Sequence, residues 1–406
     1  MPTTEQQVVS QLKQLVAQPS VSSPDPHWDA SNRGVIETLA GFADRLGFQV
    51  EVQALDPGPD GKANLIARLG PEATQANDQG GLVLAGHTDT VPFDEGRWAT
   101  DPLTLAERDG GLYGLGSTDM KGFFPVALAA VAEVGAAGLR APLYLLATAD
   151  EESTMRGARK LPMDALRGAS AAIIGEPTNL KPVRLHKGIM MQGVRLQGRS
   201  GHSSDPALGR NVIEVLPALL AMLDDYRREL AAEHRCELLA VPTPTMNFGC
   251  LHGGDSPNRI CGELDFSFDV RMVPGLDHAD IEQTLNQRLG QLGQDYDIEI
   301  GMHRLVEPVP AFEQPAGSAG VTAAEDASGE TAGAVNFATE APFLQQLGLD
   351  TVVMGPGSID VAHQPNEFMP MSQLRPGIDV IKRLIGHHCH ERHQPTIAEI
   401  PCSPFS

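Results

Sequence analysis

The chain has 406 residues and a formal charge of −22, because 52 aspartates and glutamates outnumber 30 lysines and arginines. Its apolar fraction of 41% is enough for a hydrophobic core, and its length favours two domains over one. The acidic balance argues against nonspecific binding to nucleic acid or to anionic membranes. No apolar run is long enough to cross a bilayer, which argues against a membrane protein.

The N-terminus and the cysteines predict a cytoplasmic protein. The first residues have neither the basic nor the apolar region of a secretory signal. The cysteines are odd in number, widely spaced and without a Cys-x-x-Cys motif: Cys236, Cys250, Cys261, Cys389 and Cys402. This pattern favours reduced thiols over a disulfide framework.

The first part of the chain alternates helical and strand patterns. Apolar residues at helical spacing predict helices around Val8–Val16 and Ile36–Leu46, and Phe123–Val134 predicts a third. Short apolar runs bounded by Gly, Asp and Pro predict buried strands at Asn64–Leu69, Gly81–Ala85, Leu143–Ala147 and Ala171–Ile174. We therefore expect an α/β-sheet domain.

The pattern changes near Lys187. Strands and helices are predicted in the order βαββαβ, at Gly188–Gln197, Val212–Leu230, Thr245–Leu251, Arg259–Arg271, Ala279–Leu292 and Tyr296–Leu305. This order is that of a ferredoxin-like sheet. We expect a catalytic domain of residues 1–187 and 306–390, an inserted domain of residues 188–305, and a tail of residues 391–406. Helix and strand signals of the first domain resume at Glu340–Gln346 and Thr351–Met354.

Three late segments carry weaker signals. Residues 314–334 are rich in Ala, Gly, Ser, Glu and Thr, which predicts a loop or a weakly helical segment. Three prolines after Gln394 predict an extended or disordered tail. His387-His388-Cys389-His390 contains metal-binding residue types, and we interpret this run as a solvated helix end.

Most of a set of histidines and carboxylates lie where predicted strands end, and one, Asp119, lies directly before a predicted helix. They are His87 and Asp89 in GHTDTVP, Asp119 in GSTDMKG, Glu151 and Glu152, Glu176, and His363 in AHQP. Ligands of α/β sheets bind beyond the carboxyl ends of strands, so these side chains are candidates for a site with two divalent metals. Imidazole and carboxylate favour Zn²⁺, with Co²⁺ or Mn²⁺ as alternatives. Taken singly, a His-x-Asp pair, a Glu-Glu pair and an Asp before a helix each have ordinary structural explanations.

The motifs resemble those of the cocatalytic-zinc family of aminoacylases, deacetylases and carboxypeptidases. The resemblance covers about residues 5–390 and rests on the order of GHTDTVP, LYGLGSTDMKG, ATADEES, IIGEPTNL, LHKG, GRSGHSSDP, SPNRI, TEAPF and GPGSIDVAHQPNE. It is strongest to the branch of that family that removes the acetyl group of N2-acetyl-L-ornithine in arginine biosynthesis.

The resemblance implies a role for each of these residues. His87 and Glu176 would bind one metal, Glu152 and His363 the other, and Asp119 both. Asp89 would hydrogen-bond and orient His87. Glu151 would be the general base.

Further implied roles lie outside this set. His202 would stabilise the oxyanion, Asn258 and Arg271 would bind the substrate α-carboxylate, and Glu340 would accept the ornithine ammonium group. An Arg at a strand end and a Glu at a helix start also occur without such roles.

We therefore expect an α/β metallohydrolase that deacetylates N2-acetyl-L-ornithine with two zinc ions and dimerises through its insert. Two alternatives remain. One is a broader N-acyl-amino-acid deacylase or dipeptidase on the same scaffold. The other is a metal-free binding or regulatory relative, against which the presence of every implied ligand argues.

Overall fold

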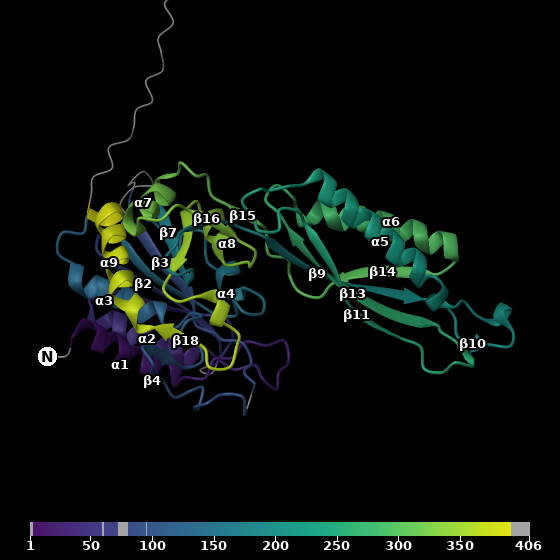
Figure 1. Cartoon of the computed structure of the whole chain (residues 1–406), viewed down its shortest axis with the longest axis horizontal. Helices are drawn as coiled ribbons and strands as arrows, with labels where there is room; N and C mark the ends of the chain where they lie inside the picture. The colour runs from purple at the N-terminus through teal and green to yellow at the C-terminus, as the bar shows by residue number, and fades with distance from the viewer. Residues whose placement is uncertain (1–2, 59–60, 72–79, 95, 391–406) are drawn as a thin grey trace, which may run out of the picture.

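The structure is a computed structural model that describes residues 3–58, 61–71, 80–94 and 96–390. The predicted tail and Cys402 lie outside these residues. Two sheets dominate the molecule, and each lies in its own lobe (Figure 1).

The larger sheet is mixed and has nine strands, in the order β1-β2-β6-β3-β7-β17-β8-β15, with β16 beside β8. Its central strands β6, β3, β7 and β17 run parallel, while β2 and β8 flank them antiparallel. The strand bounds are β1 Gln49–Ala54, β2 Ala63–Leu69, β3 Leu82–His87, β6 Leu143–Thr148, β7 Ala171–Pro177, β8 Val183–His186, β15 Phe312–Glu313, β16 Gly333–Val335 and β17 Asp350–Gly355.

Alternation along the central strands divides the core between the two faces of this sheet. In β3, Leu82 and Leu84 belong to one hydrophobic cluster, and Val83 and Ala85 belong to another. Because both faces are covered, the strand is buried along its whole length, which explains its continuous apolar run. The four strands predicted from apolar runs are therefore confirmed as β2, β3, β6 and β7.

Helices cover both faces of the larger sheet. One face packs against helices whose bounds are α1 Thr4–Val16, α2 Arg33–Arg45, α3 Phe123–Val134, α7 Ala319–Ser328 and α9 Leu374–Ile385. The other face packs against α8 Ala341–Gln346, and the short helix α4 Arg156–Arg159 lies beside α8. A small antiparallel sheet adds β4 Ala106–Arg108, β5 Gly111–Tyr113 and β18 Phe368–Pro370, in the order β18-β5-β4.

The second lobe is a four-stranded antiparallel sheet with helices on one face. The chain enters it directly after β8, and the elements follow as β9 Gly188–Gln197, α5 Leu216–Glu233, β11 Thr245–Gly253, β13 Glu263–Met272, α6 His278–Tyr296 and β14 Glu299–Arg304. The strand order is β11-β13-β9-β14. Alternate side chains of β13 are buried with the apolar faces of both helices in a separate hydrophobic cluster. A two-stranded pair, β10 Gly201–His202 and β12 Arg259–Ile260, extends from the far end of this sheet (Figure 1).

Several predicted bounds differ from the structure. The helix predicted at Val212–Leu230 is divided into a 3₁₀ turn, Val212–Glu214, and α5. Tyr296 ends α6 instead of beginning a strand. The strand predicted at Arg259–Arg271 is interrupted at Gly262, where a Cβ atom would lie 2.5 Å from Ser200 Oγ.

Two late segments differ from the predictions of a loop or weakly helical segment at residues 314–334 and of a solvated helix end at residues 387–390. Within residues 314–334, α7 is a regular helix that begins at the Ser318 cap and ends at Gly329, whose φ is +77°. Its small buried residues, such as Ala324, suit close packing against β17. The segment Gly386–His390 is helical, and His388 and Cys389 within it are buried rather than solvated.

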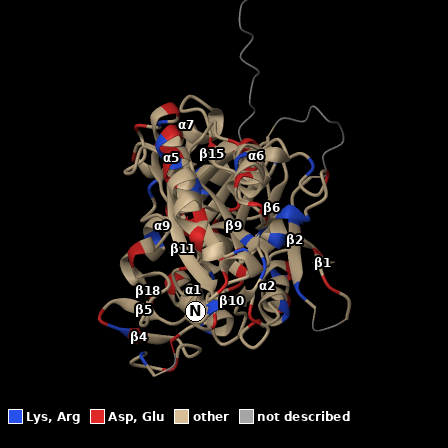
Figure 2. Cartoon of the chain, turned by 90° about the vertical axis from the view of Figure 1, so that its right-hand side faces the viewer, with Lys and Arg blue, Asp and Glu red and all other residues tan. Residues whose placement is uncertain are grey.

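The described residues also bear on membrane spans, disulfides and the distribution of charge. None of their helices is long and apolar enough to span a bilayer. The four cysteines among them are free thiols. Acidic and basic segments are interspersed over the face in view, including α5 and α6 (Figure 2).

Candidate metal centre

The predicted ligands meet at one edge of the larger sheet. His87 is the last residue of β3, Glu176 lies near the end of β7, and Glu151 follows the end of β6. Because these strands are parallel and adjacent, their carboxyl ends lie together. Asp119 comes from the loop before α3, and His363 comes from the segment between β17 and β18.

Asp119 lies between two groups of potential ligands. Its Oδ1 atom is 3.1 Å from His87 Nε2, and its Oδ2 atom is 3.2 Å from His363 Nε2. Glu176 Oε1 lies 3.8 Å from His87 Nε2, and Glu152 Oε1 lies 3.1 Å from His363 Nε2. Possible ligand atoms therefore lie within 4.8 Å of one another in His87–Asp119–Glu176 and in Asp119–Glu152–His363. Glu151 forms a third such group with His87 and Glu152.

The excess of negative charge in this cluster favours the binding of cations. Burial and neighbouring carboxylates raise the pKa values of Glu176 and Glu151 well above the ordinary range. Hydrogen bonds to Asp119 and Glu152 raise the pKa of His363 to about 10. Burial opposes a charge on His87, but its contact with Asp119 still raises its pKa well above the ordinary value. Four carboxylates thus face two histidines, an imbalance that two divalent cations would neutralise.

Asp89 contacts His87 through its backbone. The hydrogen-bonding partner of His87 Nδ1 is the backbone carbonyl of Asp89, at 3.0 Å. The nearer side-chain oxygen, Oδ1, is 3.7 Å from Nδ1, and Oδ2 accepts a hydrogen bond from the Glu152 N–H. Asp89 therefore connects the segment after β3 to the Glu152 loop.

The loop that carries Glu151 and Glu152 is held by Asp150. This residue adopts a left-handed conformation with φ +61°, and its carboxylate accepts hydrogen bonds from Lys62 and from Ser22. Lys62 lies directly before the first residue of β2. No sequence pattern marks Lys62 or Asp150 as a support of the site.

Glu340 lies beneath the strand ends and is only 1% exposed. Its Oε2 atom is 2.8 Å from the Thr148 hydroxyl, and the backbone of Ala158 also interacts with this carboxylate. Burial raises the pKa of Glu340 to about 7. The side chain predicted to meet a substrate ammonium group is thus enclosed.

The remaining predicted residues lie in the second lobe, at two different ends of it. His202 and Asn258 are neighbours at its far end, where the Ser203 N–H donates to the Asn258 carbonyl and His202 is exposed. Arg271 lies at the opposite end of β13, beside the first residues of β9. The 10 residues of β13 correspond to a length of about 30 Å at ~3.3 Å per residue.

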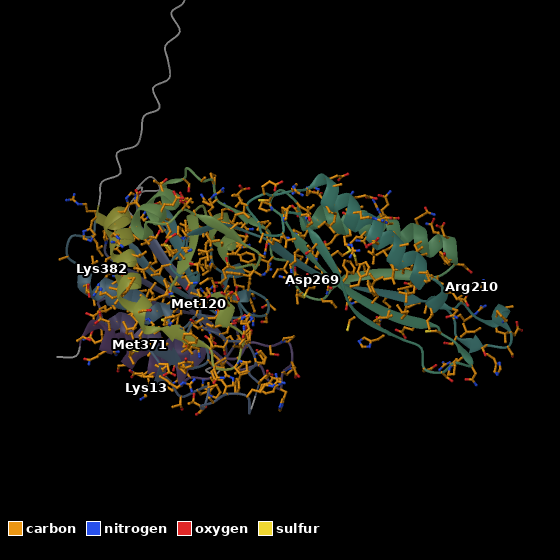
Figure 3. The ribbon with its side chains drawn as sticks, in the orientation of Figure 1. Lys13, Met120, Arg210, Asp269, Met371 and Lys382 are labelled. Atoms are coloured by element: carbon orange, nitrogen blue, oxygen red, sulfur yellow. The ribbon has the colours of Figure 1, made fainter. Side chains whose placement is uncertain are left out.

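The figures agree with this separation. Figure 3 places Met120, the neighbour of Asp119, in the first lobe, Asp269 at the near end of the second lobe, and Arg210 at its far end. Arg210 bridges to Arg199, three residues before His202. Within one chain, His202 and Asn258 therefore lie far from the ligand cluster, whereas Arg271 lies toward it.

Comparison with known proteins identifies the family. The model of peptidase family M20/M25/M40 matches residues 83–387. The chain belongs to this family. It is 46% identical to an acetylornithine deacetylase of Erwinia tasmaniensis over 378 residues, covering 93% of this chain and 97% of the relative.

Two solved structures of the family's fold extend along nearly the whole chain. Aminopeptidase PepT from Bacillus cereus has a TM-score of 0.71 at 18% identity and covers 94% of this chain and 98% of its own. The Bacillus subtilis YXEP protein, described as a dinuclear metal-binding peptidase of family M20, has a TM-score of 0.67 at 13% identity and covers 94% and 97%. At these identities the similarity shows the fold.

Proposed function

We propose that this chain is a metal-dependent amide hydrolase that converts N2-acetyl-L-ornithine to L-ornithine and acetate. The similarity to acetylornithine deacetylases over 93% of the chain carries the choice of substrate. The arrangement of Asp119 between two sets of His and carboxylate side chains supports amide hydrolysis at a two-metal site.

Two divalent ions fit the donor set, and zinc is the expected metal, with cobalt as an alternative. His87 and Glu176 would hold one ion, Glu152 and His363 the other, and Asp119 both. When bound, such ions polarise a carbonyl and make water a stronger nucleophile.

The residues of the chain supply the proton transfers. Glu151 lies in the ligand cluster with His87 and Glu152, where a carboxylate can exchange protons with the attacking water. Glu151 takes the proton of the attacking water and delivers it to the amide nitrogen, so that acetate and the free amine separate. Asp89 holds the segment after β3 against the Glu152 loop and so keeps the ligands and the base in position.

Substrate recognition involves the junction of the two lobes. Arg271 is the expected partner of the substrate α-carboxylate, and the nearby Lys187 adds positive charge. Burial, and then the charge of Arg271, lower the pKa of Lys187. Arg271 is 2.9 Å from Asp269 Oδ1 and would exchange this ion pair for the substrate.

The second lobe acts in this proposal as a ferredoxin-like insert, residues 188–305, that forms a lid and a homodimer interface. His202 and Asn258 lie far from the cluster of their own chain, so they would complete the site of the partner subunit. His202 would donate a hydrogen bond to the tetrahedral oxyanion, and Asn258 would help Arg271 hold the α-carboxylate.

Glu340 remains the candidate acceptor of the substrate ammonium group. Because its side chain is enclosed beside Thr148, this role requires the segment before α8 to open. We further propose a cytoplasmic location and a place in arginine biosynthesis, consistent with the reduced cysteines and with the substrate.

The direct test is hydrolysis of N2-acetyl-L-ornithine by the full chain, with and without a chelator. We expect release of acetate that stops on chelation and returns with Zn²⁺ or Co²⁺. Comparison of kcat/KM over N-acetyl amino acids and dipeptides separates the proposed substrate from the broader deacylase or dipeptidase. No hydrolysis by the zinc-loaded protein would refute the proposal.

A further inference from the structure

Glu367 occupies an unusual position in the first lobe. The residue is only 2% exposed, and its carboxylate accepts three backbone hydrogen bonds from the loop before α3. Oε1 accepts from the N–H groups of Thr118 at 2.8 Å and Asp119 at 2.9 Å, and Oε2 accepts from Gly116 at 3.1 Å. Burial of a carboxylate costs free energy unless hydrogen-bond donors compensate it. The three N–H groups of the loop therefore stabilise Glu367, and Glu367 in turn fixes the loop.

The same region adds backbone contacts to the loop. The Gly114 N–H donates to the Glu367 carbonyl at 3.1 Å, and the Thr118 hydroxyl donates to the Phe368 carbonyl at 3.0 Å. Phe368 belongs to β18, which pairs with β5 just before the loop. The loop therefore lies fixed against the Glu367 segment from both ends.

This contact joins two segments that both carry metal ligands. Asp119 is itself one of the residues whose N–H binds Glu367, and His363 lies four residues before Glu367 in the chain. Asp119 must present one oxygen to His87 and the other to His363. A small rotation of the Asp119 backbone would move both oxygens, so the orientation of this loop affects both metal positions.

We propose that Glu367 is a positioning residue for the metal centre: its carboxylate fixes the Asp119 loop so that Asp119 faces both metal positions before any metal binds. This inference rests on the proposed two-metal function. A residue that orients a ligand without touching the metal commonly contributes about 10–100-fold to metal affinity or activity.

The test uses Glu367→Gln and a matched control. The amide keeps the size of the side chain and one acceptor oxygen for Thr118 and Asp119, but its NH₂ group faces the Gly116 N–H, donor against donor. The control is Asp350→Asn. Asp350 also accepts a backbone hydrogen bond, from Gly320 at 2.8 Å, and a side-chain bond from Ser318, but it supports α7 away from the ligands.

Zinc affinity of the dialysed full-length proteins is measured against buffered free Zn²⁺, with absorption spectra after Co²⁺ loading. We expect Glu367→Gln to bind both ions about 10–100-fold more weakly, with an altered Co²⁺ spectrum. In this variant kcat should recover as free Zn²⁺ rises while KM stays near the wild-type value. Asp350→Asn should lower the unfolding temperature and leave zinc affinity unchanged. Wild-type zinc affinity and Co²⁺ spectrum in folded Glu367→Gln would overturn the proposal.

A measurement on the unmodified protein covers the case in which Glu367→Gln does not fold. Amide hydrogen exchange should show the Thr118 and Asp119 N–H groups protected in both the metal-free and the zinc-loaded protein. Rapid exchange in the metal-free protein would refute positioning before metal binding. Failure of the proposed function looks different: the wild-type chain would bind two ions with protected amides and still not hydrolyse N2-acetyl-L-ornithine.

Discussion

A subunit-mixing experiment tests whether His202 acts on the partner's metal centre. Glu151→Gln removes the base from a chain's own site, and His202→Ala removes the oxyanion donor that the chain would supply to its partner. The ~30 Å length of β13 separates His202 from the cluster of its own chain. A histidine at that distance cannot donate a hydrogen bond in its own site.

The expected recovery follows from two-fold symmetry. Loss of the base costs about 10²–10⁴-fold in rate, and loss of one oxyanion donor costs about 10²–10³-fold, so each homodimer is nearly inactive. Free exchange of equal amounts makes about half of the dimers mixed, and each mixed dimer has one intact site. Activity should therefore rise to about a quarter of the wild-type value on this symmetry argument.

The assay follows acetate release after exchange, with mixed dimers demonstrated by native mass spectrometry of chains carrying different tags. Mixing Glu151→Gln with His87→Ala is the matched control, because both changes damage a chain's own site and no mixed dimer regains an intact one. Recovery in the control, or no recovery with His202→Ala despite proven exchange, would refute the action of His202 across the interface.

Three further predictions concern the first lobe and its junction. Glu151→Gln should keep both metals but lower kcat about 10²–10⁴-fold, and a variant with more than about a tenth of wild-type kcat would contradict the base assignment. Asp119→Ala should weaken both metals and His363→Ala mainly one, as metal analysis after dialysis would show; two tight metals in Asp119→Ala would exclude bridging. Arg271→Ala should lower kcat/KM strongly for N2-acetyl-L-ornithine but add little loss for an analogue without the α-carboxylate, and additive losses would mean that the two groups do not meet.

The sequence predicted best where local pattern and tertiary environment agree. Strand β3 is apolar throughout because helices cover both faces of the sheet, so its environment is visible in its composition. The ligands that follow β3, β6 and β7 lie together because these strands are parallel and adjacent, whereas the roles of Asp119 and His363 were implied by the family resemblance. In α7 the local pattern and the tertiary environment disagree. Small residues such as Ala324 make a poor apolar stripe, but they pack well against a neighbouring strand.

Contacts between distant segments could not be predicted in this way. The bonds from Thr118 and Asp119 to Glu367 span about 250 residues, and no local pattern marks a carboxylate as a backbone acceptor. The hydrogen bond of His87 to the Asp89 carbonyl, rather than to its carboxylate, likewise depends on backbone geometry. Glu340 illustrates a third limit, because its type and motif indicate chemistry but not that the side chain is enclosed.

The strand order of the larger sheet also determines when, during synthesis on the ribosome, the protein can be completed. β17 lies between β7 and β8 in the middle of the sheet, yet it is made only after the whole second lobe. The second lobe pairs strands from one continuous stretch and can fold as soon as β14 emerges. Until Asp350–Gly355 follows, β7 is paired with β3 on one side only, and an open strand edge of this kind is prone to aggregation. Nascent chains stopped before this point should therefore depend on chaperones, although most of their residues are already made.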